Sequence, residues 1–122
     1  MIIFVGTDIV EVSRIQQMIK SKGDQFFTHI YNKIEVDYCS KRVNPALHYA
    51  GRFSAKEAVK KAILASGLFD HVLLKDIVIH RDISGVPRVV LPKDLSDKGS
   101  VKVSISHTDN YATATAIFQL KQ

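Results

Sequence analysis

A long helical segment with a strip of small side chains constrains the fold of this 122-residue chain more than any other feature. Asn44-Pro45 supplies an N-cap and a proline at the first helical position, and Gly67 marks the end of the helix. Residues three and four apart share one helix face. The face turned toward the core is therefore predicted to carry mostly small or apolar side chains: Ala50, Phe53, Ser54, Glu57, Ala58, Lys61, Ala62 and Ala65.

Two charged residues interrupt this strip, where a core-facing helix normally carries leucine or isoleucine. A charge in such a place must be paired, must bind a metal or must turn toward a cleft. Glu57 and Lys61 are four residues apart, and an ordinary ion pair at that spacing contributes only about 0.3–0.5 kcal/mol on a solvated helix. The spacing alone leaves both a structural ion pair and a functional site open.

The N-terminal segment adds another acidic residue. Residues 2–5 are typical of a short buried strand, and the apolar residues from Val12 to Ile19 then recur at helical spacing up to Gly23. Asp8 is thus predicted to lie where the strand gives way to a helix and to cap that helix, a role worth about 1 kcal/mol. An N-cap uses one carboxylate oxygen, so the other would remain free for a hard metal ion.

The rest of the chain is predicted to supply a scaffold. Asn32 and Glu35 form the pattern of a capping box, which opens a short helix ending near Lys41. Four segments are predicted as strands with turns between the members of each pair, namely 77–81, 88–91, 101–107 and 112–117. Because helices come first and strands largely follow, we predict one domain over residues 1–122 of class α+β. Its N-terminal helices, including the long one, should pack on a mostly antiparallel sheet.

Composition excludes several classes of protein. Hydrophobic residues make up 46% of the chain, which is typical of a folded protein rather than a disordered one. No apolar run approaches the ~20 residues that span a bilayer, and the start lacks the basic segment of a signal peptide. The single cysteine, Cys39, cannot form an internal disulfide and suits a reducing compartment. We therefore expect a cytoplasmic protein in which Cys39 has a packing role.

The net charge of +5 indicates an anionic partner. Nucleic acid, membrane headgroups and acidic proteins all attract a basic surface. No aromatic platform or zinc-ligand spacing accompanies the basic residues, so nucleic acid has no support in the sequence. The first helix offers basic residues beside an apolar one, which suits docking of an acidic helix: Arg14, Met18, Lys20 and Lys22. A solvated basic face explains Lys20 and Lys22 nearly as well.

Four sequence pieces in a fixed order connect the chain to a known family. They span almost the whole chain, from about residue 2 to about residue 118. The pieces are Gly6-x-Asp8-Ile9-Val10-Glu11-x-x-Arg14-Ile15, Gly51-Arg52-Phe53-Ser54-Ala55-Lys56-Glu57-Ala58-x-x-Lys61-Ala62, Gly85-x-Pro87 and Ser104-Ile105-Ser106-His107-Thr108. With these pieces the chain resembles the holo-(acyl-carrier-protein) synthase family, the small 4'-phosphopantetheinyl transferases of fatty acid biosynthesis.

The resemblance implies a reaction and roles for three residues. Members of the family use Mg²⁺ to transfer 4'-phosphopantetheine from coenzyme A to a serine of apo-acyl carrier protein, releasing adenosine 3',5'-bisphosphate. By resemblance, Asp8 and Glu57 match the metal ligands, and Lys61 matches the lysine that stabilises or protonates the leaving phosphate. The serine proton goes either to Glu57 or to a metal-bound water, and the sequence does not choose between them.

The resemblance also implies a coenzyme A site. The stretch Ser106-His107-Thr108 would line it, with His107 at a phosphate and the two hydroxyls as weaker donors. By its strand position alone, His107 would more often be a hydrogen-bonded packing residue. The candidates for the 3'-phosphate are Arg52 and either Lys41 or Arg42, because a guanidinium can hold phosphate bidentately. Gly85 and Pro87 would let a hairpin backbone approach the adenine, although turn chemistry alone explains them as well.

Quaternary structure and partner follow from the resemblance only. The family implies a homotrimer with active sites between subunits, in which Asp8 and His107 come from one subunit and the helix of Glu57 from the next. It also implies an acidic carrier protein as partner. In the turn after the long helix, Ala65-Ser66-Gly67-Leu68-Phe69 replaces the Gly-Thr-Gly-like sequence of relatives. Residues 42–49 also lack the acid that the family tends to place before its Ala-Gly-Arg-Phe run. Two other functions remain open, namely transfer to polyketide or other carriers and a non-catalytic basic binding module.

Overall fold

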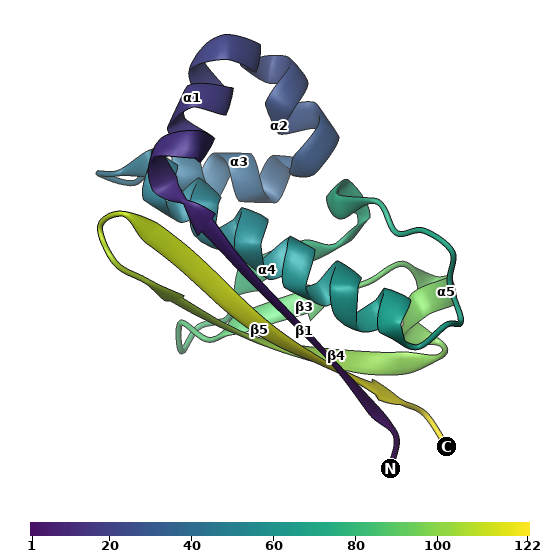
Figure 1. Ribbon diagram of the computed structural model, residues 1–122. Helices are drawn as coiled ribbons and strands as arrows, with labels where there is room; N and C mark the ends of the chain where they lie inside the picture. Colours follow the sequence, from purple (N-terminus) through teal and green to yellow (C-terminus); the bar gives the residue numbers. More distant parts are fainter.

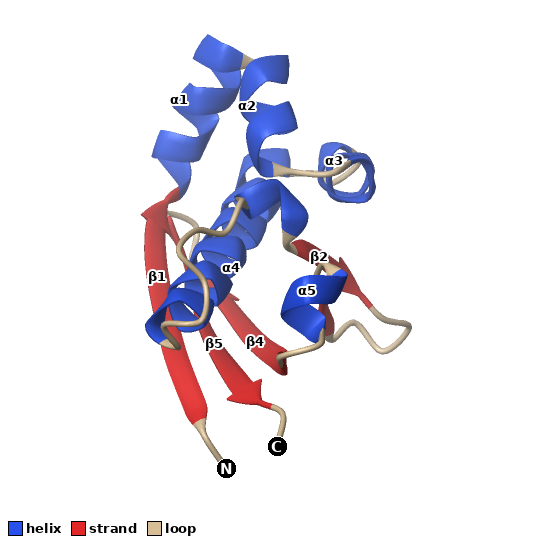
Figure 2. Ribbon diagram, turned by 90° about the vertical axis from the view of Figure 1, so that its right-hand side faces the viewer, coloured by secondary structure: helices blue, strands red, loops and turns tan.

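The structure, a computed structural model, describes residues 1–122 and packs one long helix across a three-stranded antiparallel sheet (Figure 1). Three short helices gather at the N-terminal end of the long helix. A two-stranded hairpin and a further short helix lie beside the long helix, away from the first strand (Figure 2). In chain order the elements are β1 (Ile3–Glu11), α1 (Val12–Lys22), α2 (Asp24–Ile30), α3 (Lys33–Ser40), α4 (Pro45–Ala65), the 3-10 helix η1 (Leu74–Asp76), β2 (Val78–Arg81), β3 (Pro87–Val90), α5 (Lys93–Ser96), β4 (Gly99–His107) and β5 (Tyr111–Leu120).

The C-terminal strand is the centre of the main sheet. β5 pairs with β1 on one side and with β4 on the other, so the strand order is β1-β5-β4 and the two chain ends lie close together (Figure 1). On β5 the side chains facing α4 are Ala112, Ala114, Ala116 and Phe118, all buried. Their small size matches the alanines and Ser54 on the facing side of α4, which allows helix and sheet to approach closely.

Gly6 is the point of closest approach between α4 and β1. A Cβ atom at this position would overlap the carbonyl oxygen of Ala58 and would lie 2.6 Å from the backbone nitrogen of Ala62. Only glycine fits there. Since side chains alternate along a strand, Asp8 projects from the same face as Gly6 and is brought beside the next turn of α4.

The fold class and most elements predicted from the sequence are confirmed. The long helix begins at Pro45, and Gly67 follows its end with a φ of 75°. Asn32 and Glu35 form the expected capping box at the start of α3. The hairpin β2–β3 and the pair β4–β5 both form antiparallel ladders. The sequence did not predict α2.

The predicted role of Asp8 as an N-cap is wrong. β1 continues to Glu11, and Asp8 lies inside it, opposite Ala114. Pairing with β5 along nine residues outweighs the local capping preference, and α1 begins at Val12 without a side-chain cap. Residues 2–5 are also not the buried strand that was predicted, because Ile3 and Val5 face outward and are 46% and 55% exposed.

The predicted inner strip of α4 is only partly correct. Ala50, Ser54, Ala58 and Ala62 are buried, but Phe53 and Glu57 are half-buried, and Lys61 and Ala65 are exposed. The reason is that α4 is covered twice, by the sheet on one side and by α3, η1 and β2 on the other (Figure 2). The buried arc is therefore wider and includes Arg52, Ala55, Lys56, Val59 and Ile63.

Two groups of buried apolar side chains make up the core. One lies between α4, the hairpin and the main sheet, and the other between α1, α2, α3 and the start of α4. Both α4 and β5 contribute side chains to each group. No helix here is both long enough and apolar enough to cross a lipid bilayer.

Candidate active site

An acidic centre lies where β1 meets α4. The ammonium nitrogen of Lys61 is 3.4 Å from Oδ1 of Asp8 and donates a hydrogen bond of 3.0 Å to the carbonyl oxygen of Thr7. The side chain of Lys61 is 54% exposed, whereas that of Asp8 is largely covered. A hollow of about 470 Å³ opens at this point, lined by Thr7, Asp8, Ile9, Lys61 and Thr113.

Asp8 is held in place by its backbone, which leaves its carboxylate available. The carbonyl oxygen of Asp8 accepts hydrogen bonds from Ser54 Oγ at 3.0 Å and from Thr113 Oγ1 at 2.8 Å. Its Oδ2 is buried and has no hydrogen-bond partner. A buried carboxylate oxygen without a partner is costly, so this atom is suited to a cation that is supplied with the substrate.

Glu57 lies one helical turn before Lys61 and forms no ion pair with it. Its carboxylate is half-buried and takes part in no hydrogen bond or salt bridge within the chain. No group of three His, Cys, Asp or Glu side chains is placed to hold a metal ion. A site with one or two carboxylates, completed by water and substrate phosphates, is the kind that Mg²⁺ uses, and the unpartnered oxygen of Asp8 fits it.

A second centre is strongly basic and lies between α3, α4 and β2. The guanidinium carbons of Arg42, Arg52 and Arg81 lie 4.0, 4.5 and 6.0 Å from the centre of the Tyr38 ring. None of the three is paired with a carboxylate. A hollow of about 360 Å³, here named the arginine pocket, is lined by these four residues together with Ile34, Ile79, His80, Asp82, Ile83 and Gly85.

Arg52 is the residue of the arginine pocket best suited to bind an anion. The residue is only 3% exposed, and its Nε has no hydrogen-bond partner. Its charge is spread over a planar group that matches phosphate in a two-pronged geometry. The pocket is therefore suited to a phosphate group.

His48 lies beside the arginine pocket, and its pKa is affected by the positive charges there. Its ring centre lies 5.9 Å from that of Tyr38. Burial lowers the pKa of His48 below its ordinary value of 6.5, and the charges of Arg42, Arg52, Arg81 and His107 lower it further. Burial is the main cause, and the cations that add to it are the ones that would attract an anion.

Comparison with known proteins identifies the family. A family model described as the 4'-phosphopantetheinyl transferase superfamily matches residues 4–116. The chain belongs to this superfamily. It is 43% identical to the holo-(acyl-carrier-protein) synthase of Chlamydia pneumoniae, with 95% of this chain and 96% of the relative covered, and 42% identical to that of Protochlamydia amoebophila, with 93% and 95% covered.

Solved structures of synthases share the fold. The Helicobacter pylori holo-(acyl-carrier-protein) synthase in complex with coenzyme A superimposes with a TM-score of 0.82 at 28% identity, covering 94% of this chain and 99% of that one. The Bacillus anthracis synthase in complex with coenzyme A (3',5'-ADP) gives 0.80 at 29% identity, covering 97% and 96%. The predicted family and its α+β fold are thus confirmed.

Within this phosphopantetheinyl transferase, the structure gathers only some of the residues that the sequence singled out for coenzyme A. Arg42, Arg52 and Gly85 line the arginine pocket, but Lys41 does not. Pro87 lies on a separate hollow of about 350 Å³ between β3 and β4. His107 ends β4, exposed, on the sheet face turned toward α4.

The two hydroxyl residues beside His107 are placed differently from one another. Ser106 is exposed on the outer face of the sheet, opposite Thr113. Thr108 uses its hydroxyl oxygen to accept hydrogen bonds from the backbone N–H groups of Asn110 and Tyr111, so it stabilises the β4–β5 turn. Neither lines the arginine pocket.

Sequence reasoning missed three residues around the arginine pocket. Tyr38, His48 and Arg81 come from α3, α4 and β2, and no spacing along the chain connects them. The only signal was the general excess of basic residues in this part of the sequence.

The residues expected to dock a carrier protein lie on α1. Arg14, Lys20 and Lys22 are exposed and Met18 is half-buried. Met18 and Lys22 border an apolar groove of about 330 Å³ between α1, α2 and α4, which is also lined by Gln25, Phe26, His29, Ile30 and Phe53. Arg14 and Lys20 are outside that groove.

One expectation about the subunits is wrong for this transferase. Asp8 and the helix of Glu57 were expected to come from different subunits. In the structure Ser54 and Lys61 of α4 contact Asp8 within one chain. The cause is the tight packing at Gly6, which joins β1 to α4 directly.

Proposed function

We propose that this chain transfers the 4'-phosphopantetheine group of coenzyme A to a serine of apo-acyl carrier protein, as a holo-(acyl-carrier-protein) synthase of fatty acid biosynthesis. The second product is adenosine 3',5'-bisphosphate. One observation carries the proposal: two buried polar atoms lack partners, Asp8 Oδ2, which suits a cation, and Arg52 Nε, which suits an anion. A nucleotide coenzyme bound with a divalent ion satisfies both.

Asp8 and Glu57 are the side chains that would hold Mg²⁺. The unpartnered Oδ2 of Asp8 and the unpaired carboxylate of Glu57 are the hard oxygen ligands that this ion prefers. When bound, Mg²⁺ supplies positive charge to the pyrophosphate of coenzyme A and helps to orient it.

Lys61 and Glu57 would carry out the proton and charge chemistry. Charge develops on the leaving phosphate during transfer, and the exposed ammonium of Lys61 can reach and neutralise it. The carboxylate of Glu57 makes no internal hydrogen bond, so it is free to accept the proton of the carrier serine.

The arginine pocket would bind the 3'-phosphate of coenzyme A. Arg42, Arg52 and Arg81 surround Tyr38 with no acidic partner. His107 lies near enough to lower the pKa of His48 and would contact a phosphate beside this pocket. Gly85 lines the pocket from the hairpin, and Pro87, Ser106 and Thr108 would border the coenzyme from outside it.

We also propose that the protein is a homotrimer with active sites at subunit interfaces. The sheet face opposite to α4 exposes large apolar side chains, a surface that a monomer rarely leaves open: Ile3, Val5, Ile9, Tyr111 and Ile117. Ile9 and Thr113 on this face also line the hollow at Asp8. A second subunit packed there would close that hollow.

The carrier protein would dock on α1. Arg14, Lys20 and Lys22 would attract an acidic helix, and Met18 would contact it at the mouth of the apolar groove. Opposite charges of this kind raise association rates and fix orientation. The cytoplasm is the location we assign, because the only cysteine is a buried free thiol that suits a reducing compartment.

A mass measurement tests the proposed function. Apo-acyl carrier protein incubated with this chain, coenzyme A and Mg²⁺ should gain the mass of one phosphopantetheine. Glu57→Gln should abolish the gain while leaving the circular dichroism spectrum unchanged. No gain with any divalent metal would favour a non-catalytic basic binding module, for which Glu57→Gln would be neutral. Equal or faster transfer to polyketide carriers would move the substrate assignment to those carriers.

A further inference from the structure

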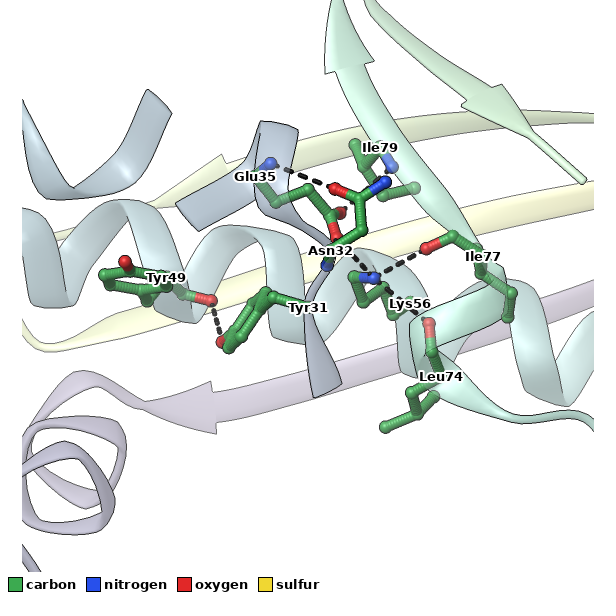
Figure 3. Close-up of polar contacts among 8 residues, drawn as sticks. All are labelled: Tyr31, Asn32, Glu35, Tyr49, Lys56, Leu74, Ile77 and Ile79. Atoms are coloured by element: carbon green, nitrogen blue, oxygen red, sulfur yellow. Dashed lines mark hydrogen bonds and ion pairs between the residues drawn. The ribbon is translucent and has the colours of Figure 1, made fainter. Parts of the chain in front are cut away.

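A fully buried ion pair lies beside the arginine pocket, and the proposed mechanism does not use it. The Nζ of Lys56 is 2.6 Å from Oε1 of Glu35, and both side chains have no exposed surface. Figure 3 shows the pair and its polar contacts with Asn32, Leu74, Ile77 and Ile79. The sequence did not single out Lys56 as a buried charge, although it stands next to Glu57 in the sequence.

Every polar side-chain atom of the Lys56–Glu35 pair has a hydrogen-bond or ion-pair partner. Lys56 Nζ donates to the carbonyl oxygens of Leu74 at 3.0 Å and Ile77 at 2.6 Å, so its three protons all have acceptors. Glu35 accepts from the backbone N–H of Asn32 and of Ile79, each at 3.0 Å. The network therefore joins α3, α4 and the chain entering β2 through one buried centre (Figure 3).

Stability alone is a weak reason for such a pair. Burying two charges costs several kcal/mol per ion, and apolar residues of similar volume often give an equally or more stable protein. The site is strongly desolvated, since neither side chain has exposed surface, and this burial lowers the pKa of Lys56 while Glu35 acts in the opposite direction. What an ion pair adds over apolar packing is a fixed direction and register for the elements that it joins.

Each end of the network is close to a residue of the arginine pocket. Glu35 precedes Tyr38 by one turn of α3, and Lys56 follows Arg52 by one turn of α4. Ile79, whose N–H is bound by Glu35, lines the pocket itself and precedes Arg81 by two residues on β2. The same three elements supply the aromatic ring and two of the three guanidinium groups.

The pocket needs such a frame because its own charges repel one another. Arg42, Arg52 and Arg81 converge on one ring, and none of them is paired with a carboxylate. Asp82, which lines the pocket, pairs with Arg88 instead. Arg52 and Lys56 are one turn apart on the same face of α4, so Glu35, which contacts Lys56, is an acid on that face that could otherwise attract Arg52. Lys56 neutralises Glu35 and leaves the guanidinium of Arg52 directed to the pocket.

We propose that the Lys56–Glu35 pair is a positioning device for the arginine pocket, and that through it the enzyme distinguishes ligands with a 3'-phosphate from ligands without one. The assignment rests on the proposed function, in which the 3'-phosphate of coenzyme A occupies this pocket. Lys56 and Glu35 touch no substrate. They act through Arg52, Tyr38 and Arg81.

Calorimetry with two product-like nucleotides tests the proposal. The dissociation constants of 3',5'-ADP and 5'-AMP are measured for the wild type, Lys56→Met, Glu35→Gln, the double variant of the two, and Val59→Ala. Val59 is equally buried on α4 but lies outside the network, so Val59→Ala is the control for destabilisation alone. KM and kcat for coenzyme A and for dephospho-coenzyme A complete the comparison.

We expect Lys56→Met to raise the dissociation constant of 3',5'-ADP tenfold or more while changing that of 5'-AMP less than twofold. KM for coenzyme A should rise more than kcat falls. KM and kcat for dephospho-coenzyme A should be unaffected. The double variant should recover part of the loss, because it removes the unpaired carboxylate that competes for Arg52. Val59→Ala should lower Tm and leave the ratio of the two affinities unchanged.

Two results would overturn the proposal: an unchanged affinity ratio in a folded Lys56→Met, as when both nucleotides lose affinity equally, or a shifted ratio in Val59→Ala. If Lys56→Met does not fold, Glu35→Gln decides, because it keeps the shape and one acceptor but loses the charge. An unchanged ratio in that variant is equally negative. A wild type that binds 3',5'-ADP and 5'-AMP alike would instead contradict the placement of the 3'-phosphate under the proposed function.

Discussion

Arg52 and Asp8 illustrate how single residues set the chemistry of the two centres. Each keeps one buried polar atom without a hydrogen-bond partner inside the chain. Such atoms are rare in folded proteins because the loss of water is not offset. The guanidinium can be satisfied only by an acceptor and the carboxylate only by a cation or a donor, so the two atoms select ligands of opposite charge.

His48 should sense the binding of phosphate in the arginine pocket. Burial and three arginines hold its pKa below 6.5 in the free protein, and a bound phosphate dianion should raise it. Because the bound form then holds the proton more tightly, 3',5'-ADP should bind more tightly as the pH falls through the pKa of the bound form. The pKa of His48 is measured by NMR with and without 3',5'-ADP.

A matched variant separates this effect from titration of the phosphate itself. His48→Gln removes the imidazole while the phosphate still titrates. The difference between the two proteins in the pH dependence of affinity should therefore report His48 alone. An NMR pKa that does not change on binding would place the phosphate elsewhere.

Cys39 should make the fold sensitive to alkaline pH. Burial raises the pKa of its thiol from 9.0 to about 11, and Arg52 partly offsets the effect. A pKa that is raised on folding gives stability that is complete below pH 9 and is lost as the pH rises through about 11. At 1.36 kcal/mol per pKa unit the loss is about 2–3 kcal/mol.

Urea unfolding of the wild type and Cys39→Ala between pH 8 and 11 measures this contribution. The alanine variant should be the less stable protein at pH 8, because the buried thiol leaves a small cavity. The difference in free energy of unfolding should shrink by about 2–3 kcal/mol as the pH rises. A difference that stays constant with pH would show that the thiol is not desolvated.

At the level of elements, the contact between β1 and α4 assembles the acidic centre. Gly6→Ala should force the helix away from the strand, since the new methyl group would overlap the backbone of Ala58. We expect the free energy of unfolding to fall by about 3 kcal/mol or more and phosphopantetheine transfer to be lost. Gly51→Ala is the matched control, because a Cβ there meets only the side chain of Ile105 at 3.4 Å. Its stability should change by no more than about 1 kcal/mol.

Local signals were enough for elements whose partners are near in sequence. The capping box of α3, the Pro45 start of α4 and the β4–β5 hairpin all depend on residues within a few positions of one another. β1 could not be predicted in the same way. Its length comes from pairing with β5, more than a hundred residues away, and that pairing placed Asp8 inside a strand instead of at a helix start.

In the candidate site, too, local features could be predicted from the sequence and features that depend on distant partners could not. Glu57 and Lys61 stood out as charges on the predicted inner strip of α4, and the family resemblance joined Asp8 to them. The structure places Asp8 beside Lys61. Helical periodicity found which residues of α4 share a face, but the width of the buried arc depends on α3 and β2. Lys56 was missed for that reason, since its partner Glu35 is on another helix.

The whole chain is expected to unfold as one unit, in keeping with a single domain over residues 1–122. α4 and β5 each contribute to both apolar clusters, so neither cluster can open alone without exposing the other. Tyrosine fluorescence reports mainly the cluster of Tyr31 and Tyr49, and circular dichroism at 222 nm reports mainly α4. The two urea transitions should coincide, and separate midpoints would contradict a single cooperative unit.

Transfer activity at the acidic centre should depend on assembly of the subunits. The outer face of the sheet is apolar, and Val5 and Ile117 lie opposite each other on it. Val5→Lys would place a charge in the proposed subunit contact. In light scattering after size exclusion we expect the mass to fall from that of three chains to the 13.6 kDa of one. Transfer activity should fall with it, because the hollow at Asp8 loses its second wall.

The control for Val5→Lys is a lysine at another exposed apolar position. Leu68 is exposed, follows α4 and belongs to no strand of the sheet, so Leu68→Lys should keep both the assembled mass and the activity. If the wild type runs as a fully active monomer, the apolar face has some other occupant. If Val5→Lys stays trimeric, the subunits meet elsewhere. An active monomeric Val5→Lys would show that one chain already holds every group that the transfer requires.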